Sequence, residues 1–195
     1  AAAPKAVPAK ITIETTEKLI NGDFSACEDA MSHFYISPDS RSVTYAAKSG
    51  DKMAVVVNGQ IIREHEQIGI STPFFAPDNK TVAYAARDGE KWFVVVDGKE
   101  LAGRYDEIGI ATMAFSPDSK HFAYVAREGD KWNVMVDGKA IKQHEVIKMA
   151  SLVFSPDSKR VAYIAGVGEK FFVVADGQES GLYDYIPNIV PAFSP

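Results

Sequence analysis

The sequence predicts an all-β fold of stacked four-stranded antiparallel sheets, and three observations support this prediction. A unit of 39 or 40 residues recurs along the chain, and a fixed period of this length indicates stacked structural units. Each copy contains short runs of β-branched and aromatic residues bounded by turn-forming pairs, without helical periodicity. One run in each copy is apolar on both faces, which requires a sheet above it and another below it. Units with these properties are typical of the blades of a β-propeller.

A proline in a short turn anchors each copy of the repeat. The copies begin near residues 34, 75, 115, 154 and 193. In the third copy the turn is Ser116–Ser119, and its proline pre-sets the backbone angle of the second position while Ser and Asp side chains bond to nearby amides. We therefore expect a type I turn in each copy. The anchoring prolines are Pro38, Pro77, Pro117, Pro156 and Pro195.

Four strands are expected in each copy, and the third copy gives their order. The first is expected at residues 110–115 and the second, after the proline turn, at residues 121–126. The third and fourth, at residues 132–136 and 139–146, are joined by Asp137-Gly138. Such a pair favours a type I′ hairpin, in which two successive residues need positive φ. Equivalent pairs are Asn58-Gly59, Asp97-Gly98 and Asp176-Gly177.

The side chains of the second and third strands predict how the sheets pack. In the second copy the third strand points Trp92, Val94 and Val96 to one face and Phe93 and Val95 to the other. The second strand points Val82, Tyr84 and Ala86 one way and the small Ala83 and Ala85 the other way. Large side chains of one sheet can therefore dock over the alanines of its neighbour.

The chain length equals five periods of 39 residues, so we expect five blades, the last one shared by the two ends of the chain. Residues 1–10 are expected to be a flexible segment and residues 11–195 a single domain. By register, residues 11–16 and 18–24 supply the third and fourth strands of the shared blade, and the C-terminus supplies the first. Pro4 and Pro8 oppose a second strand there. The alternatives are a fragment of a larger propeller, or a ring that a second chain completes.

Charge and composition exclude some classes of partner. The formal net charge is −5, from 21 basic and 26 acidic residues, whereas nucleic acids and anionic membranes select a cationic surface. No apolar run approaches the roughly 20 residues that span a bilayer. Cys27 is the only cysteine, so a disulfide within the chain is impossible. The opening residues AAAPKAVPAK resemble those left after signal-peptide cleavage, which favours a periplasmic or extracellular location.

Two stretches carry a resemblance to a known family. FSPDSKHFAYVA at Phe115 and FSPDSKRVAYIA at Phe154 resemble the Pro-Asp (PD40) repeat of TolB-type proteins, a WD40-like propeller repeat. The resemblance covers roughly Phe34 to Pro195. It implies a propeller that serves as a protein-docking scaffold or as a gating domain attached to serine peptidases, but neither a TolB-like α/β domain nor a peptidase domain is recognisable in the sequence. The family usually has glycine after the aspartate, whereas this chain has Ser40, Asn79, Ser119 and Ser158.

No catalytic residue, metal ligand or cofactor site is expected, so the chain is predicted not to be an enzyme. The recurring Asp39, Asp78, Asp118 and Asp157 are interpreted as turn caps, one in each copy. His65 and His144 occupy the position that Tyr105 and Tyr183 fill in other copies, which indicates a planar packing group. Two histidines in separate blades do not offer the three or four convergent ligands of a zinc site.

The candidate partner-binding residues lie at one end of the blades. Lysines follow the hairpin between the second and third strands, and acidic residues precede each first strand, so the two sets are expected at the same end. Salt bridges between blades, or a polar rim that faces a partner, would both use this pattern. The candidates are Lys52, Lys91, Lys131 and Lys170, the apolar Ile68, Ile108, Ile147 and Ile186, and the aromatic Tyr105, Tyr183 and Tyr185.

Three functions are compatible with these observations. The leading hypothesis is a non-catalytic scaffold that binds or assembles with another protein through this end of the blades. The second is recognition of a glycan or small ligand at the channel mouth, as an accessory domain of a hydrolase, with the tyrosines stacking on sugars. The third is a structural subunit that self-associates by strand addition at its terminal blade.

Overall fold

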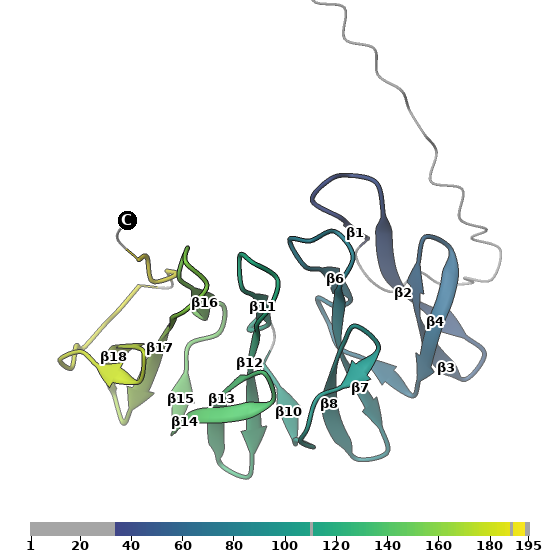
Figure 1. The fold of residues 1–195 in the computed structure, drawn as a ribbon. Coiled ribbons are helices and arrows are strands. Elements are labelled where there is room, and N and C mark those ends of the chain that lie inside the picture. The colour runs from purple at the N-terminus through teal and green to yellow at the C-terminus, as the bar shows by residue number, and fades with distance from the viewer. Residues whose placement is uncertain (1–33, 110, 188, 194–195) are drawn as a thin grey trace, which may run out of the picture.

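The computed structural model describes residues 34–109, 111–187 and 189–193, and the regular structure in these residues consists of β-strands alone. Four antiparallel sheets stand side by side in a row along the chain (Figure 1). The first sheet contains β1 (Tyr35–Ile36), β2 (Val43–Ser49), β3 (Lys52–Val57) and β4 (Gln60–His65). The second contains β5 (Gln67–Ile68), β6 (Phe74–Phe75), β7 (Val82–Asp88), β8 (Lys91–Val96) and β9 (Lys99–Glu100).

The other two sheets repeat the pattern of the second. The third contains β10 (Glu107–Ile108), β11 (Ala114–Phe115), β12 (Phe122–Glu128), β13 (Lys131–Val136) and β14 (Lys139–His144). The fourth contains β15 (Val146–Ile147), β16 (Val153–Phe154), β17 (Val161–Val167), β18 (Lys170–Ala175) and β19 (Gln178–Glu179). In the last three sheets two short strands pair with the same long strand, as β10 and β11 pair with β12. The pair forms one interrupted strand, here called the inner strand.

The turns have the predicted hydrogen bonds and backbone angles. In the third copy the Ser119 amide donates to the Ser116 carbonyl at 2.9 Å, which closes the proline turn. Asp137 and Gly138 both have positive φ, 51° and 78°, as a type I′ hairpin requires. Ser119 also has a positive φ of 62°, so the serine stands in a left-handed conformation that glycine usually occupies.

The hydrophobic core lies between the sheets. Ala123, Val125 and Val134 of the third sheet form one buried cluster with Tyr163 and Phe172 of the fourth. The second sheet contacts the third in the same way, since Ala83 clusters with Phe122 and Tyr124. The prediction that large side chains dock over the alanines of the neighbouring sheet is confirmed.

Two strand boundaries differ from the prediction. The strand expected at residues 139–146 ends at His144, and Val146–Ile147 instead cross to the fourth sheet and pair with β17. The first strand expected at residues 110–115 pairs only at Ala114–Phe115, and its other half is Glu107–Ile108. Both differences arise because each inner strand is interrupted. The position of the proline turns in the sequence does not predict this interruption.

Most of the predicted shared blade would be formed by residues 1–33, which lie outside the described residues. At the other end, residues 189–193 belong to no strand. The first and fourth sheets stand at opposite ends of the row (Figure 1). The all-β propeller arrangement of four-stranded blades is confirmed, and closure of a five-bladed ring stays a prediction.

Candidate binding groove on the inner strands

Each interruption of an inner strand is a bulge stabilised by a buried hydroxyl. In the third sheet the Thr112 hydroxyl donates to the Gly109 carbonyl at 2.7 Å and accepts the Val125 amide at 3.3 Å. In the fourth sheet Ser151 makes equivalent bonds to the Lys148 carbonyl and the Ile164 amide. The hydroxyl therefore replaces the backbone acceptor that the ladder loses where the strand bulges out.

The bulges turn apolar side chains out of the sheets. Ser71, Ala111 and Ala150 have positive φ of 63°, 54° and 60°, and the residue before Ser71, Ile70, is 72 % exposed. Met149, before Ala150, is 41 % exposed. Exposed aliphatic residues at a repeated, strained backbone position indicate a surface with a function beyond folding.

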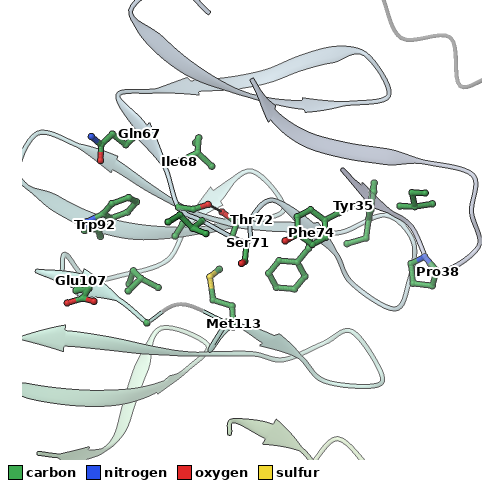
Figure 2. Close-up of a pocket in the computed structure, with 18 residues that line it drawn as sticks. Tyr35, Pro38, Gln67, Ile68, Ser71, Thr72, Phe74, Trp92, Glu107 and Met113 are labelled. Carbon is green, nitrogen blue, oxygen red and sulfur yellow. Dashed lines mark hydrogen bonds between the residues drawn. The ribbon is translucent and has the colours of Figure 1, made fainter. Parts of the chain in front are cut away.

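A hollow in the described surface lies beside these bulges. It has a volume of about 740 Å³ and is lined by β1, by the inner strands of the second and third sheets, and by Pro38, Ala85 and Trp92. Figure 2 shows Trp92, Gln67 and Glu107 at one end and Tyr35 and Pro38 at the other, with Phe74 and Met113 between them. We call this hollow the inner groove. Its size is within the range of ligand-binding sites.

The floor of the groove depends on close backbone approach. A Cβ atom added to Gly69 would lie 2.9 Å from the Cβ of Ala85. Glycine at this position lets the inner strand lie tightly on β7, and the small Ala85 leaves the space above it open. Ile36, at 61 % exposed, and Ile70 border the groove, so it is an apolar site with solvent-accessible walls.

Few polar groups are available in the groove. Glu107 forms an ion pair with Arg127 at 3.0 Å, and the Thr72 hydroxyl is engaged with the Gly69 carbonyl at 2.7 Å. The Arg87 guanidinium lies 5.5 Å from the centroid of the Trp92 ring. Apolar contact, with Gln67 and Ser71 as orienting groups, is therefore what the groove can offer a ligand.

The turn aspartates lie where the prediction placed them and cap their own turns. Asp118 accepts the Ser116 hydroxyl at 2.6 Å and the Lys120 amide at 3.1 Å, and the Ser116 bond in the first place lowers the pKa of this carboxyl. The residue that follows Asp78, Asp118 or Asp157 reaches the preceding sheet. Ser158 accepts the Asp118 amide at 3.0 Å and Ser119 accepts the Asp78 amide at 2.9 Å. A polar side chain in place of glycine thus links neighbouring sheets.

Three of the four predicted lysines form salt bridges with predicted acids, and two of those acids also accept an amide of the next sheet. Lys91 bonds to Asp106 at 2.5 Å, and Asp106 also accepts the Gly129 amide of the third sheet at 2.8 Å. Lys131 pairs with Glu145 at 3.2 Å, and Lys170 pairs with Asp184. Bonds to Lys91 and then to Gly129 lower the pKa of Asp106. Lys91, Lys131 and Lys170 therefore have the structural role that the salt-bridge interpretation gave them.

The apolar candidates are divided between groove and core. Ile68 and Ile108 line the inner groove, but Ile147 and Ile186 are buried, at 3 % and 8 % exposed. Ile147 is buried because it lies in β15, which pairs with β17 of the fourth sheet. Those two side chains are therefore absent from the exposed surface on which they were expected to contact a partner.

The tyrosine candidates also have different environments. Tyr105 is 5 % exposed, and its hydroxyl lies 3.1 Å from that of Tyr124, so it cannot stack on a sugar. Tyr183 and Tyr185 are exposed, but neither lines the groove. Lys148 lies 5.2 Å from the centroid of the Tyr185 ring. No candidate tyrosine enters the groove, whose aromatic lining is Tyr35, Phe74, Phe75 and Trp92.

The histidines are packing groups at the sheet interfaces. Nε2 of His144 lies 3.0 Å from the Tyr163 hydroxyl, and Nε2 of His65 lies 3.3 Å from the Tyr84 hydroxyl. The Tyr105–Tyr124 pair is equivalent. No cluster of three or more potential metal ligands occurs within residues 34–109, 111–187 and 189–193. A search of the same residues finds no helix suited to crossing a membrane.

One of these histidines gives a pH-dependent prediction. Burial lowers the pKa of His144, so its contribution to stability is present above the ordinary histidine pKa of about 6.5 and is lost as the pH falls below it. Glu179, Lys142 and Tyr163 face the ring. We expect His144→Tyr to reduce the loss of melting temperature between pH 7 and pH 5, because the tyrosine used in the second copy does not titrate there.

The control for this prediction is His121→Gln, which changes an imidazole that is 46 % exposed. It should leave most of the acid sensitivity in place. Equal melting-temperature profiles for the wild type and His144→Tyr would contradict the assignment of a buried, neutral His144.

No protein-family model matches the chain, and no curated protein is similar to it in sequence. Several solved structures are similar in fold. The propeller domain of the Trilobed protease from Pyrococcus furiosus, described as having an open velcro topology, has 16 % identity and a TM-score of 0.53, over 76 % of this chain and 55 % of that one. An acylaminoacyl peptidase in complex with a chloromethyl ketone has 14 % identity and a TM-score of 0.50, over 78 % and 32 %.

TolB from Acinetobacter baumannii has 18 % identity and a TM-score of 0.46, over 79 % of this chain and 42 % of its own. The chain thus spans about a third to about half of the length of these structures. The likeness to the propeller domain of the Trilobed protease, at a TM-score of 0.53, concerns the fold alone, and it agrees with the row of four-stranded sheets. The chain has the fold of a β-propeller repeat protein.

Proposed function

We propose that this protein is a non-catalytic scaffold that binds an apolar segment of another protein in the inner groove. The observation that carries the proposal is the groove itself, with a volume of about 740 Å³ across three sheets and a predominantly apolar lining. Its ends at Trp92 and Tyr35 leave room for an extended segment along the inner strands (Figure 2). Exposed apolar surface of this kind is characteristic of interaction sites.

The inner groove is a different surface from the end of the blades that carries the lysines. There the charged side chains are paired with one another, and paired, exposed charges offer a partner little net attraction. Ile36 and Ile70 are solvent-exposed and lie on neighbouring sheets. A partner residue inserted between them would bury aliphatic surface worth about 25 cal/mol per Å².

Ile70→Asp tests this proposal. Ile70 is exposed, so the substitution should leave the melting temperature nearly unchanged, while the carboxylate makes an apolar ligand unfavourable. Phage-displayed random peptides selected on the wild-type protein should include binders with clustered apolar residues. We expect their affinity for Ile70→Asp to fall at least about tenfold, the equivalent of about 1.4 kcal/mol.

The matched control is Ile141→Asp, at an isoleucine of β14 that is 51 % exposed and lies away from the groove. It should bind the selected peptides as the wild type does. Equal loss in both variants, or no loss in either, would contradict binding at the groove.

A second candidate function is recognition of a glycan or small ligand in the same groove. Trp92 and Tyr35 in its lining favour this candidate, since aromatic rings stack on sugar faces. A glycan array that gives binding abolished by Ile70→Asp, together with no peptide selection, would favour it over the scaffold. The periplasmic or extracellular location stays a prediction, which fractionation of the native cell would check.

A further inference from the structure

Arg87 places a positive charge at the end of the inner groove that contains Trp92 and Gln67 (Figure 2). Its side chain lies on the same face of β7 as Ala85, since alternate residues of a strand share a face, and Ala85 lines the groove. Arg87 pairs across the sheet with Gln67 on one side and Trp92 on the other. Residues paired in this way also share a face. The Arg87 side chain therefore belongs to the row of residues that closes this end of the groove.

The equivalent arginine of the third sheet binds a carboxylate that Arg87 lacks. Nε and Nη2 of Arg127 lie 3.1 Å and 3.0 Å from Oε2 of Glu107. Arg127 pairs with Glu107 across the sheet as Arg87 pairs with Gln67, but Gln67 is a neutral amide. Within residues 34–109, 111–187 and 189–193, the buried Nε of Arg87 has no hydrogen-bond partner. A carboxylate that binds Arg87 therefore displaces no acceptor of that nitrogen in the described part of the chain.

The fourth sheet shows that the sheet itself does not require an arginine at this position. Gly166 occupies the position of Arg127 and pairs with Val146, which occupies the position of Glu107. Arginine and acid are thus both present in the third sheet and both replaced in the fourth. In the second sheet the arginine is present and its acid is replaced by an amide, so Arg87 is a cation available to an acid from outside its own sheet.

The orientation of the Arg87 guanidinium is already the one that binds a carboxylate in the third sheet. The guanidinium carbon of Arg87 lies 5.5 Å from the centroid of the Trp92 ring, and that of Arg127 lies 5.8 Å from the centroid of Trp132. A cation–π contact of this kind holds the planar guanidinium in place. Because Arg127 binds its carboxylate while it contacts Trp132, the same contact at Trp92 prepares Arg87 for the same role.

The charges around Arg87 leave this end of the groove positive. Glu107 lines the same end, but Arg127 neutralises it. Asp88 follows Arg87 on the opposite face of the strand, where it lies 2.7 Å from Nδ1 of His65. The formal net charge of the chain is −5, so an acidic ligand is not attracted from a distance. Its preference for this site must come from direct contact with the guanidinium.

We propose that the segment bound in the inner groove carries an aspartate or glutamate beside its apolar residues, and that this carboxylate pairs with Arg87. The inference rests on the proposed function, since it concerns the ligand of the same groove. The ligand is an acidic side chain of another protein, in the role that Glu107 has for Arg127. The apolar residues of the segment then extend from Trp92 toward Tyr35 (Figure 2).

The phage-displayed peptides selected on the wild-type protein supply the probes for this inference. We expect the selected sequences to carry Asp or Glu at a fixed distance from their apolar cluster. Each peptide is synthesised in an acid form and in an amide form, with Asn or Gln in place of the acid, and dissociation constants are measured by fluorescence anisotropy. The acid form should bind the wild type at least about tenfold more tightly than the amide form. On Arg87→Gln this ratio should fall to about one.

Gln67→Glu is a second variant, which keeps the arginine and so guards against a loss of folding in Arg87→Gln. It builds in the second sheet the pair that Glu107 and Arg127 form in the third, so the new carboxylate competes for Arg87. The preference for the acid form should be lost here as well. Arg63→Gln is the matched control, because it removes the same charge from β4, where Arg63 pairs with Glu100 at 3.2 Å. It should keep the tenfold preference.

A ratio near one on the wild type would overturn the inference, as would a preference that survives Arg87→Gln or Gln67→Glu. Ile70→Asp separates this failure from a failure of the proposed function. Peptides that lose affinity for Ile70→Asp but show no preference for the acid form bind the groove without Arg87, and they refute the carboxylate alone. Peptides that bind Ile70→Asp as tightly as the wild type refute binding at the groove, and this inference with it.

Discussion

Replacing Thr112 by valine is expected to lower the free energy of unfolding by at least about 2 kcal/mol, the largest effect we expect from exchanging one hydroxyl for a methyl group in this protein. The side chain is 1 % exposed and serves both the Gly109 carbonyl and the Val125 amide. Valine has nearly the same shape and neither bond. Two buried backbone groups would lose their partner, at about 1–3 kcal/mol for each unsatisfied group. Urea denaturation followed by circular dichroism measures the change.

Thr112→Ser is the matched control, because it keeps the hydroxyl and removes only a methyl group. It should retain most of the stability that valine loses. If Thr112→Val and Thr112→Ser lower the free energy of unfolding by equally small amounts, the bulge does not depend on the hydroxyl. The description of the inner strand would then be wrong.

The second large effect is expected from Ala123→Leu. Ala123 is fully buried between the third and fourth sheets, in a cluster with Leu152, Phe154 and Tyr163. Extra methyl groups there must displace side chains of two closely packed sheets, at about 1–3 kcal/mol. A lower melting temperature in calorimetry is the expected result.

Ala140→Leu is the control, since Ala140 lies exposed on β14. It should leave the melting temperature almost unchanged. An Ala123→Leu variant as stable as Ala140→Leu would show that small residues are not what allows the sheets to approach.

The parts of the fold that depend on local chemistry could be predicted from the sequence. Asp137-Gly138 and Ser116–Ser119 form their turns through backbone angles and hydrogen bonds within a few residues. Residues such as Ala83 and Tyr84 alternate along one strand, so the faces of the sheets follow from a period of two. These features are complete within a single copy of the repeat.

The interruptions of the inner strands and the groove beside them were not predicted. Thr112 looks like an ordinary polar residue of a strand, and its role appears only when its hydroxyl replaces a backbone acceptor. The groove combines residues from three copies, so no single copy contains it. A hydroxyl residue three positions after Gly69, Gly109 and Lys148, with an aliphatic residue next to each, was the available signal.

The prediction that Ile147 lies in an exposed connection was wrong for a related reason. Ile147 was placed in an exposed connection because the fourth strand was expected to continue to residue 146. The chain instead crosses to the next sheet after His144, and Ile147 pairs with Ala165 in the core. Periodicity within a copy cannot show which sheet a strand joins.

Central to this account is that consecutive repeats stack face to face through the aromatic pairs at their interfaces. A double-mutant cycle on Tyr105→Phe and Tyr124→Phe, with unfolding free energies from urea denaturation, tests this most directly, because the two hydroxyls lie 3.1 Å apart on different sheets. The account predicts a coupling free energy of about 0.5 kcal/mol or more, and none between Tyr105→Phe and Tyr163→Phe, which lie at different interfaces. Additivity of the Tyr105 and Tyr124 substitutions within about 0.3 kcal/mol would contradict the stacked arrangement.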